Sequence, residues 1–298
     1  GSLSKHGFTV AEDPKEATVI VINTCGFIDA AKKESIDNIL EMAEYKDATK
    51  GVCRILVVAG CLTQRYSADL EVEIPEVDLF IGTGEYNKIV ELLEKQEAGK
   101  LDHKSFVDVP KFIHSDEDER MLSTPSYMAW LKVSEGCDRC CTYCAIPAIR
   151  GQLRSRSVAS LIKETKHLVE QGVKEINIIS QDLSKYGIDL GGENTLINLL
   201  KGLEAIENLA WIRLFYYYPD DLSEELIEFV KNSKKICHYL DMPVQHFSDP
   251  VLKRMNRKIT GTEIHKKIAL LRERIPDMVI RTSIIVGFPG ESDQDFEA

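Results

Sequence analysis

The sequence has no long apolar run. None of its hydrophobic stretches approaches the roughly 20 residues that a membrane-spanning helix needs. The opening residues, GSLSKHGFTV, also lack the basic n-region and the apolar h-region of a secretory leader. We therefore expect a soluble, cytoplasmic protein with no membrane partner.

An excess of positive charge is also missing. The sequence has 37 Lys and Arg against 48 Asp and Glu, which gives a formal net charge of −11. Because an acidic surface repels phosphate backbones, this balance disfavours a dedicated nucleic-acid binder and favours a basic protein as partner. The length of 298 residues is enough for two domains with a substantial core.

Apolar runs in the first hundred residues predict a small parallel α/β domain, which we place at residues 1–102. The runs ATVIVINTC and RILVVAGCL are continuous, as in strands that are buried on both faces, and a third run covers Leu79 to Ile81. Helical spacing of apolar residues predicts helices that begin near Asp29 and near Asn87.

Residues 103–126 are the predicted linker, because the segment HSDEDERMLSTPS is acidic and then rich in Ser, Thr and Pro. Strand patterns then return five times between helical patterns, at Tyr127–Val133, Glu175–Ser180, Trp211–Tyr217, Cys237–Met242 and Val279–Val286. Such units predict a parallel sheet that curves into a barrel or partial barrel, with active-site loops at the C-terminal strand ends. This second domain is placed at 127–298. Since the sequence stops just as another helix is due, we expect a truncated domain.

Four of the eight cysteines lie in one polar loop, SEGCDRCCTYCAIPAIRG. A reducing compartment keeps thiols free, which favours metal or catalytic use over disulfides. Cys137, Cys141 and Cys144 have the spacing C-x3-C-x2-C directly after the first strand of the second domain. Three thiolates from one loop can hold a cubane iron–sulfur cluster and leave its fourth iron open for a small molecule. We assign these three residues as metal ligands and as the catalytic centre.

A structural zinc site is the alternative, and it needs four ligands in a closed tetrahedron. Cys140 is the available fourth thiol, but adjacent Cys140 and Cys141 are awkward to aim at one ion. No CxxC or HxxxH half-site follows at the distance typical of a zinc finger. A non-catalytic iron–sulfur or zinc scaffold also stays open. We expect Cys140 to bind no metal, and Cys53 and Cys237 to serve packing.

With an aromatic residue, Tyr143, before its last cysteine, the loop resembles that of the radical S-adenosylmethionine (radical SAM) superfamily. The resemblance implies a partial (βα)6 TIM-like barrel, a [4Fe-4S] cluster on the three cysteines, and S-adenosyl-L-methionine on the open iron as the source of a 5′-deoxyadenosyl radical. It also implies cofactor contacts at Gln181, which follows INIIS, and at Gly287 in SIIVGFPGES. Arg213 and Gln245 point toward the same predicted cavity, with a structural role as the alternative.

Cys25 and Cys61 each follow a predicted strand, and the C-terminal ends of parallel strands lie side by side. Burial as small apolar side chains is the other interpretation. The pattern NTCGF, then GCL, then CTYCAIPAIRGQLRSRS resembles the methylthiotransferase family, whose N-terminal domain holds a second [4Fe-4S] cluster through three cysteines. Cys25 and Cys61 match the second and third of these. The first has no counterpart, and we expect it among residues that the sequence lacks.

Further motifs resemble the branch of this family that adds a methylthio group to the β-carbon of an aspartate in a ribosomal small-subunit protein. These are QDLSKYGIDL, YLDMPVQH and RTSIIVGFPGES, together with Asp138, where the branch that modifies adenosine in tRNA usually has Asn. The resemblance therefore implies a basic ribosomal protein as substrate and an electron donor such as flavodoxin. Nucleic acid is a partner only under the tRNA alternative. The family's C-terminal TRAM domain has no counterpart in the sequence.

Overall fold

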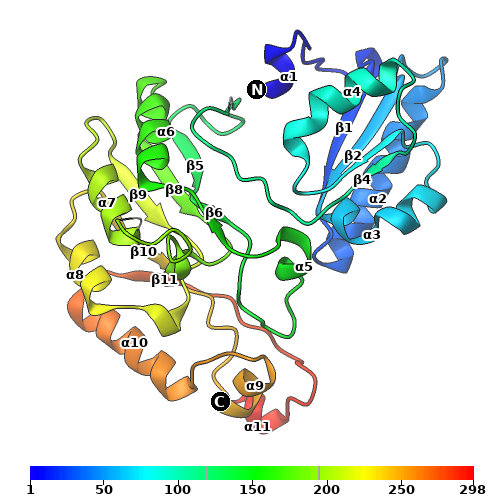
Figure 1. The fold of residues 1–298 in the computed structure, drawn as a ribbon. Coiled ribbons are helices and arrows are strands. Elements are labelled where there is room, and N and C mark those ends of the chain that lie inside the picture. Colours follow the sequence, from blue (N-terminus) through cyan, green and yellow to red (C-terminus); the bar gives the residue numbers. More distant parts are fainter. Residues whose placement is uncertain (119, 194) are drawn as a thin grey trace. The chain divides into compact units, whose positions relative to one another are not determined.

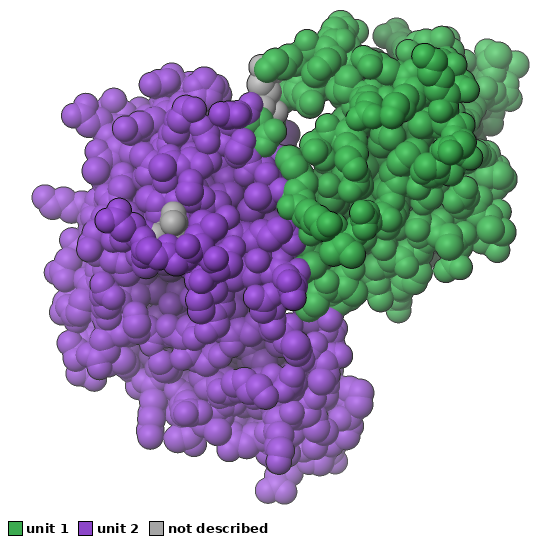
Figure 2. Space-filling view, viewed as in Figure 1, with its two compact units in different colours: residues 1–112, 118–121, 145–151 green, residues 113–117, 122–144, 152–298 purple. Residues whose placement is uncertain are grey.

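The computed structural model describes residues 1–118, 120–193 and 195–298. By their contacts, the residues form two compact units (Figure 2). Unit 1 consists of Gly1–Phe112, Asp118–Met121 and Ala145–Gly151, and unit 2 of Ile113–Glu117, Leu122–Cys144 and Gln152–Ala298. These units follow contacts rather than sequence pattern, so the domain limits given above stay predictions.

Unit 1 contains a parallel sheet of four strands in the order β1-β2-β3-β4 (Figure 1). The strands are β1 (Val19–Thr24), β2 (Ile55–Gly60), β3 (Leu79–Ile81) and β4 (Ser105–Phe106). Its helices are α1 (Ser2–Lys5), α2 (Asp29–Ala43), α3 (Cys61–Glu73), α4 (Ile89–Glu97) and α5 (Ile146–Arg150). Because strand side chains alternate between faces, β2 supplies both cores: Leu56 and Val58 pack with α2 and α3, and Val57 and Ala59 pack with α4.

Three features of unit 1 differ from the sequence expectations. The first strand is not buried on both faces: Val21 is 40% exposed, because β1 lies at the edge of the sheet with one strand neighbour. Helix α3 is not predicted, since its buried residues, Leu62, Thr63 and Leu70, are too few to give a clear helical period. Strand β4 lies within the predicted linker, where it pairs with β3.

Unit 2 contains a parallel sheet of five strands in the order β11-β10-β9-β8-β5, so strands that follow one another also pair (Figure 1). The strands are β5 (Met128–Lys132), β8 (Glu175–Ile179), β9 (Trp211–Leu214), β10 (Ile236–Asp241) and β11 (Val279–Arg281). The helices are α6 (Val158–Glu170), α7 (Leu196–Glu204), α8 (Glu224–Asn232), α9 (Asp249–Arg254), α10 (Gly261–Arg274) and α11 (Asp293–Phe296). This is the predicted succession of strand–helix units.

The two faces of the second sheet differ. Leu131, Ile176 and Ile212 belong to the core that the helices cover, while neighbouring positions such as Trp130 and Arg213 carry bulky or charged groups on the other face. Strands β9 and β11 end well before the predicted residues, at Leu214 and at Arg281, and β5 and β8 differ from the prediction by only one or two residues. The chain turns soon after β9, where Tyr216 has a φ of 58°.

Side-chain caps begin four of the long helices of unit 2. The hydroxyls of Ser157, Thr195, Ser223 and Thr260 each accept a hydrogen bond from a backbone N–H in the first turn of α6, α7, α8 and α10, respectively. A cap of this kind is worth about 1 kcal/mol. The caps thereby fix where each loop from strand to helix ends.

Short elements complete the structure. An antiparallel ribbon pairs β6 (Ser134–Glu135) with β7 (Arg154–Ser155). Single 3-10 turns cover Pro14–Glu16, Glu44–Lys46, Tyr86–Lys88, Leu183–Lys185 and Pro219–Asp221. Among the described residues, no helix combines the length and the apolar character that crossing a membrane requires.

Candidate functional site

The cysteine loop, residues 137–144, starts two residues after the ribbon strand β6, and its neighbour β7 pairs back onto that strand. Between them, Gly136 has a φ of 82°, a left-handed conformation that suits glycine. The Asp138 carboxylate accepts a hydrogen bond of 3.0 Å from the backbone N–H of Leu153 on the returning chain. The ribbon and this bond fix the start of the loop.

The three predicted ligand thiols lie close enough to affect one another. Cys137 and Cys141 are each 7% exposed, and Cys144 is half-buried. The pKa of the Cys137 thiol is raised to about 11, mainly by burial, and Asp182, Cys144 and Cys141 contribute because like charges repel. The backbone N–H of Arg139 donates a hydrogen bond of 3.4 Å to the Cys137 sulfur. Two of the three predicted sulfur donors are therefore largely shielded from water.

This donor set fits an iron–sulfur cluster better than a zinc ion. Across residues 1–118, 120–193 and 195–298, no three Cys, His, Asp or Glu side chains gather around a position for one metal ion. A closed zinc site needs four donors around a single point, whereas each thiolate of a cubane binds a different iron. Cys140, the extra thiol of the zinc alternative, is exposed, and its sulfur lies 3.8 Å from the Asp138 carbonyl.

Arg139 holds the cysteine loop to the ends of two strands. Its Nε lies 2.8 Å from a carboxylate oxygen of Asp182, which follows β8 and is 1% exposed. It also forms ion pairs with Asp220 and Asp221, on the turn after β9. Burial lowers the pKa of Arg139, but the carboxylates of Asp182 and Asp220 raise it above the ordinary value. Arg139 is thus a permanent positive charge inside the loop.

Tyr218 is a site residue that the sequence did not single out. Its hydroxyl oxygen lies 3.7 Å from the sulfur of Cys141. Two guanidinium groups lie over its ring, and their carbons are 4.3 Å (Arg139) and 4.2 Å (Arg257) from the ring centroid. Only the fold shows which tyrosine of the FYYYP run after β9 reaches the cysteines.

Three of the predicted cofactor residues lie around this loop or at the adjoining strand ends. Tyr143 contacts Phe288 edge-on, with ring centroids 6.4 Å apart, so it lies beside the loop that contains Gly287. Gly287 has a φ of 72° with open space where a Cβ would stand. The Gln181 amide donates to Glu135 across 3.1 Å, beside the start of the loop.

The other two predicted cofactor residues are placed differently. Gln245, with a φ of 74°, bridges to Ile284 through its backbone. Arg213 lies inside β9 and pairs with Glu175, the first residue of β8, at 3.1 Å. Glu175 begins β8, whereas Gln181 follows the end of that strand. At 3.3 Å per strand residue the two are about 20 Å apart. The ion pair therefore places the Arg213 guanidinium near the start of β8 and far from the predicted cofactor residues. The assignment of Arg213 to the cofactor remains a prediction that the ion pair does not support.

Arg154 and Arg156 follow the cysteine loop, where an arginine could contact an acidic substrate or be a solvated loop residue. Arg156 fits neither interpretation, because it is 5% exposed and lies 2.6 Å from Glu164 on α6. It also donates to the backbone carbonyl of Lys132 across 3.1 Å. Arg156 is therefore a structural residue, whereas Arg154 donates to the carbonyl of Gln152.

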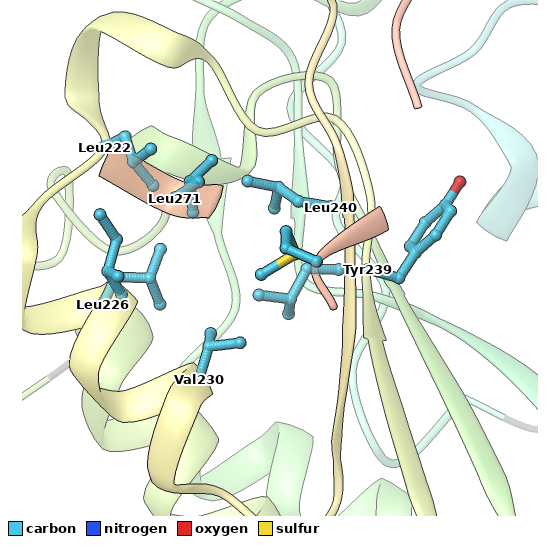
Figure 3. Close-up of a pocket in the computed structure, with 9 residues that line it drawn as sticks. Leu222, Leu226, Val230, Tyr239, Leu240 and Leu271 are labelled. Atoms are coloured by element: carbon cyan, nitrogen blue, oxygen red, sulfur yellow. The ribbon is translucent and has the colours of Figure 1, made fainter. Parts of the chain in front are cut away.

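A cavity between α8, α10 and the sheet is not a second site (Figure 3). Its volume is about 10 Å³, which is enough for no more than one water molecule. Leucines and other apolar side chains line it, and the hydroxyl of Tyr239 points away from it (Figure 3). This cavity is an imperfection in the packing of the core.

In unit 1, Cys25 and Cys61 come to neighbouring strand ends. β1 and β2 pair in register up to Thr24 and Gly60, and each cysteine is the next residue. A Cβ on Gly26 would lie 2.8 Å from the carbonyl carbon of Cys61, so the chain after Cys25 passes directly against Cys61. Cys25 is exposed and Cys61 partly buried. Two thiols therefore share one edge of this sheet.

Two arginines adjoin this pair. Arg150 of α5 donates a hydrogen bond of 3.3 Å to the Cys61 sulfur, and Arg65 of α3 donates one of 2.7 Å to the carbonyl of Gly26. Helix α5 is fixed in unit 1 by Ile149, which is fully buried and whose carbonyl accepts a hydrogen bond of 2.6 Å from Thr83. Positive charge of this kind can balance the negative charge of metal-bound thiolates.

The comparison with protein families agrees with this geometry. Residues 131–298, more than half of the chain, match the model of the Radical SAM superfamily. The chain belongs to the radical SAM superfamily. Residues 1–82 match Uncharacterized protein family UPF0004. The radical SAM fold predicted for the second domain is thereby confirmed.

Curated relatives of this radical SAM protein share one name. It is 48% identical over 296 residues to "Ribosomal protein uS12 methylthiotransferase RimO" of Geobacter sulfurreducens, and 48% identical over 297 residues to the protein of that name from Clostridioides difficile. These matches cover 99% and 100% of this chain. The chain spans 66% of the length of each relative.

Solved structures of radical SAM enzymes share the fold. One is TsrM from Kitasatospora setae with cobalamin and a [4Fe-4S] cluster bound, with a TM-score of 0.66 and 16% identity over 99% of this chain and 64% of that one. Another is OxsB with aqua-cobalamin and S-adenosylmethionine bound, with a TM-score of 0.61 and 15% identity over 90% of this chain and 40% of that one. At such identities the likeness concerns the fold alone.

Proposed function

We propose that this radical SAM protein is a methylthiotransferase that adds a methylthio group to the β-carbon of an aspartate in ribosomal protein uS12. The observation that carries the proposal is the 48% identity, over nearly the whole chain, to proteins named as uS12 methylthiotransferases. The relatives described above carry no name that favours the tRNA alternative. A ribosomal substrate implies a cytoplasmic location.

The cysteine loop would hold a [4Fe-4S] cluster through Cys137, Cys141 and Cys144. When bound, this cluster and S-adenosyl-L-methionine supply one-electron chemistry that removes a hydrogen atom from an unactivated C–H bond, which no acid–base residue can deprotonate at neutral pH. Burial of Cys137 and Cys141 keeps water from the sulfurs. Arg139, through its three carboxylate partners, holds the loop at the ends of β8 and β9.

Residues around the loop would bind and orient the sulfonium cofactor. Gly287 leaves its backbone open to a close approach, and the contact between Tyr143 and Phe288 keeps that segment beside the loop. Gln181 has a side-chain oxygen that is buried and has no hydrogen-bond partner among the described residues. An unpaired buried acceptor is costly, so a cofactor donor at this point would relieve the cost.

Cys25 and Cys61 would contribute two thiolates to a second [4Fe-4S] cluster, which the methylthiotransferase resemblance implies. Their positions at paired strand ends and the hydrogen bond from Arg150 to Cys61 support this role. A third ligand is not assigned. Two clusters would divide the work: the one in unit 2 serves the radical step, and the one in unit 1 presents the sulfur group.

The partners follow from charge and chemistry. With 37 basic against 48 acidic residues, the chain is suited to a basic substrate such as a ribosomal protein. A one-electron donor of the flavodoxin type would reduce the cluster. These partners rest on the proposed reaction.

Anaerobic reconstitution with iron and sulfide, followed by S-adenosyl-L-methionine and dithionite, tests the proposal. The expected products are 5′-deoxyadenosine and, with purified uS12, a mass gain of one methylthio group on an aspartate. Cys141→Ala is expected to abolish both products, and Cys140→Ala, which removes the exposed neighbouring thiol, is the matched control. Bound zinc without 5′-deoxyadenosine, or methylthio transfer to tRNA instead of uS12, would contradict the proposal.

A further inference from the structure

Two guanidinium groups lie over the phenol ring of Tyr218. Arg139 comes from the cysteine loop and Arg257 from the segment after α9, and their guanidinium carbons lie 4.3 and 4.2 Å from the ring centroid. Two guanidinium groups near one ring repel each other unless carboxylates balance their charges. Asp182, Asp220 and Asp221 balance Arg139.

Arg257 is anchored in a different way. It is 7% exposed, and its Nη2 donates a hydrogen bond of 2.9 Å to the carbonyl of Pro243. Its other terminal nitrogen is buried and has no hydrogen-bond partner within the described part of the chain. Burying a guanidinium whose N–H groups are not all hydrogen-bonded costs folding free energy, because the charge must leave water. A residue that served packing alone would not need this charge. The stacking of Arg257 on Tyr218 offsets part of this cost.

The hydroxyl of Tyr218 is aimed at a ligand sulfur. Its oxygen lies 3.7 Å from the Sγ of Cys141, which is within hydrogen-bond distance for sulfur. A phenol is protonated at neutral pH, and a metal-bound thiolate offers only lone pairs. The hydrogen bond in the loaded protein can therefore run in one direction only, from Tyr218 to Cys141.

We propose that Tyr218 is a positioning residue that donates a hydrogen bond to the Cys141 sulfur of the cluster, and that Arg139 and Arg257 hold its ring in place. A hydrogen bond to a ligand sulfur favours the reduced cluster, because that state carries more negative charge. The arrangement thus makes the cluster easier to reduce. This inference rests on the cluster that the proposed function assigns to the cysteine loop.

Tyr218→Phe tests the hydroxyl alone, because phenylalanine keeps the ring and both stacking contacts. The matched control is Tyr216→Phe, which removes a hydroxyl from a ring that is 49% exposed in the same run. Each protein is reconstituted with iron and sulfide, and the cluster is titrated at defined solution potentials with detection by electron paramagnetic resonance. At the wild-type midpoint, the ratio of reduced to oxidised cluster in Tyr218→Phe is expected to fall roughly three- to tenfold, and a tenfold change is about 59 mV.

Several outcomes overturn the inference. A wild-type potential in Tyr218→Phe, with the cluster intact and 5′-deoxyadenosine still formed by the wild type, refutes it and leaves the proposed function standing. An equal shift in Tyr216→Phe refutes it as well. Loss of iron from a folded Tyr218→Phe would assign the hydroxyl to holding the cluster instead of tuning it. A wild type without a cluster in the loop removes the inference together with the proposed function.

Discussion

Arg150 donates a hydrogen bond to the sulfur of Cys61 across 3.3 Å, although the two residues are 89 positions apart in the sequence. Arg150 ends α5, which belongs to unit 1, while Cys144, two residues before this helix begins, belongs to unit 2. The chain therefore leaves the cysteine loop and enters unit 1 directly. Helix α5 thus contributes Arg150 to the surroundings of Cys61 within unit 1.

The docking of α5 is expected to depend on Thr83. Its hydroxyl donates a hydrogen bond of 2.6 Å to the buried carbonyl of Ile149. Thr83→Val would leave that carbonyl without this donor. The free energy of unfolding is expected to fall by about 1–3 kcal/mol, as for a buried acceptor that loses its partner. Urea unfolding measures the loss, and hydrogen exchange is expected to show faster exchange in α5.

Thr49→Val provides the matched control. The Thr49 hydroxyl donates to the exposed carboxylate of Asp47 across 2.9 Å, so water can replace it. Its effect is expected to stay within about 0.5 kcal/mol. Equal effects of the two substitutions would mean that the bond to Ile149 does not secure α5.

Local patterns in the sequence predicted much of this fold. The run at Leu79–Ile81 is β3 as predicted, and the strand predicted at Glu175–Ser180 is β8, which ends one residue earlier. The cysteine spacing also predicted a close group of thiols, because three cysteines within eight consecutive residues cannot lie far apart in space. Such features depend on neighbours in the chain, which a sequence displays directly.

Contacts between distant residues could not be predicted in the same way. Tyr218 meets Cys141 across 77 positions, and the choice among the consecutive tyrosines of FYYYP depends on where β9 ends. For Arg213, a contact between distant residues changes the interpretation of a residue that the sequence did single out. Its place on a strand suggested the cavity, but the fold pairs it with Glu175. Side-chain partners of this kind depend on the packing of the whole unit.

The ion pairs of Arg139 are expected to be important for the stability of unit 2. Arg139→Ala would leave Asp182, Asp220 and Asp221 close together without their shared cation. Breaking a buried pair from one side costs about 3–5 kcal/mol. Asp182→Asn is expected to cost less, about 1–3 kcal/mol, because two carboxylates still face the guanidinium.

Urea unfolding of the metal-free chain measures both changes. Arg54→Ala is the control, since Arg54 is 69% exposed and lies 3.4 Å from the exposed Glu97. An exposed pair of this kind contributes about 0–1 kcal/mol. If Arg139→Ala were as mild as Arg54→Ala, the three carboxylates would not depend on Arg139.

Asp295 is expected to make stability depend on pH in the acid range. Hydrogen bonds from Ser248 and Ser292 lower the pKa of its carboxyl from the ordinary 3.8 to about 2. Because the folded pKa is depressed, the ionised group contributes stability above pH 3.8, and this contribution is lost as the pH falls toward 2. Asp295→Asn is therefore expected to be less stable than the wild type at neutral pH and nearly equal to it near pH 2.

Unfolding by urea at a series of pH values between 2 and 7 measures this difference. The exposed Asp293 in the same short helix supplies the control, Asp293→Asn, which is expected to leave the shape of the pH profile unchanged. A constant gap between Asp295→Asn and the wild type over the whole range would show that the ionised carboxylate is not the stabilising form.

The division of work proposed for the two cysteine sites leads to a prediction about Cys61. In Cys61→Ala, the cysteine loop of unit 2 keeps all of its thiols, so 5′-deoxyadenosine is expected to form at nearly the wild-type rate. The methylthio product on uS12 is expected to fall to background, because the second cluster, which would present the sulfur group, would lack one of its thiolate ligands. Cys53→Ala, a buried cysteine of the same unit that is 5% exposed, is the matched control and is expected to keep both products. Product formation is followed by chromatography for 5′-deoxyadenosine and by mass spectrometry for uS12.

If Cys61→Ala still transferred methylthio groups, the unit 1 thiols would have no part in sulfur delivery, and the hydrogen bond from Arg150 would serve only the docking of α5.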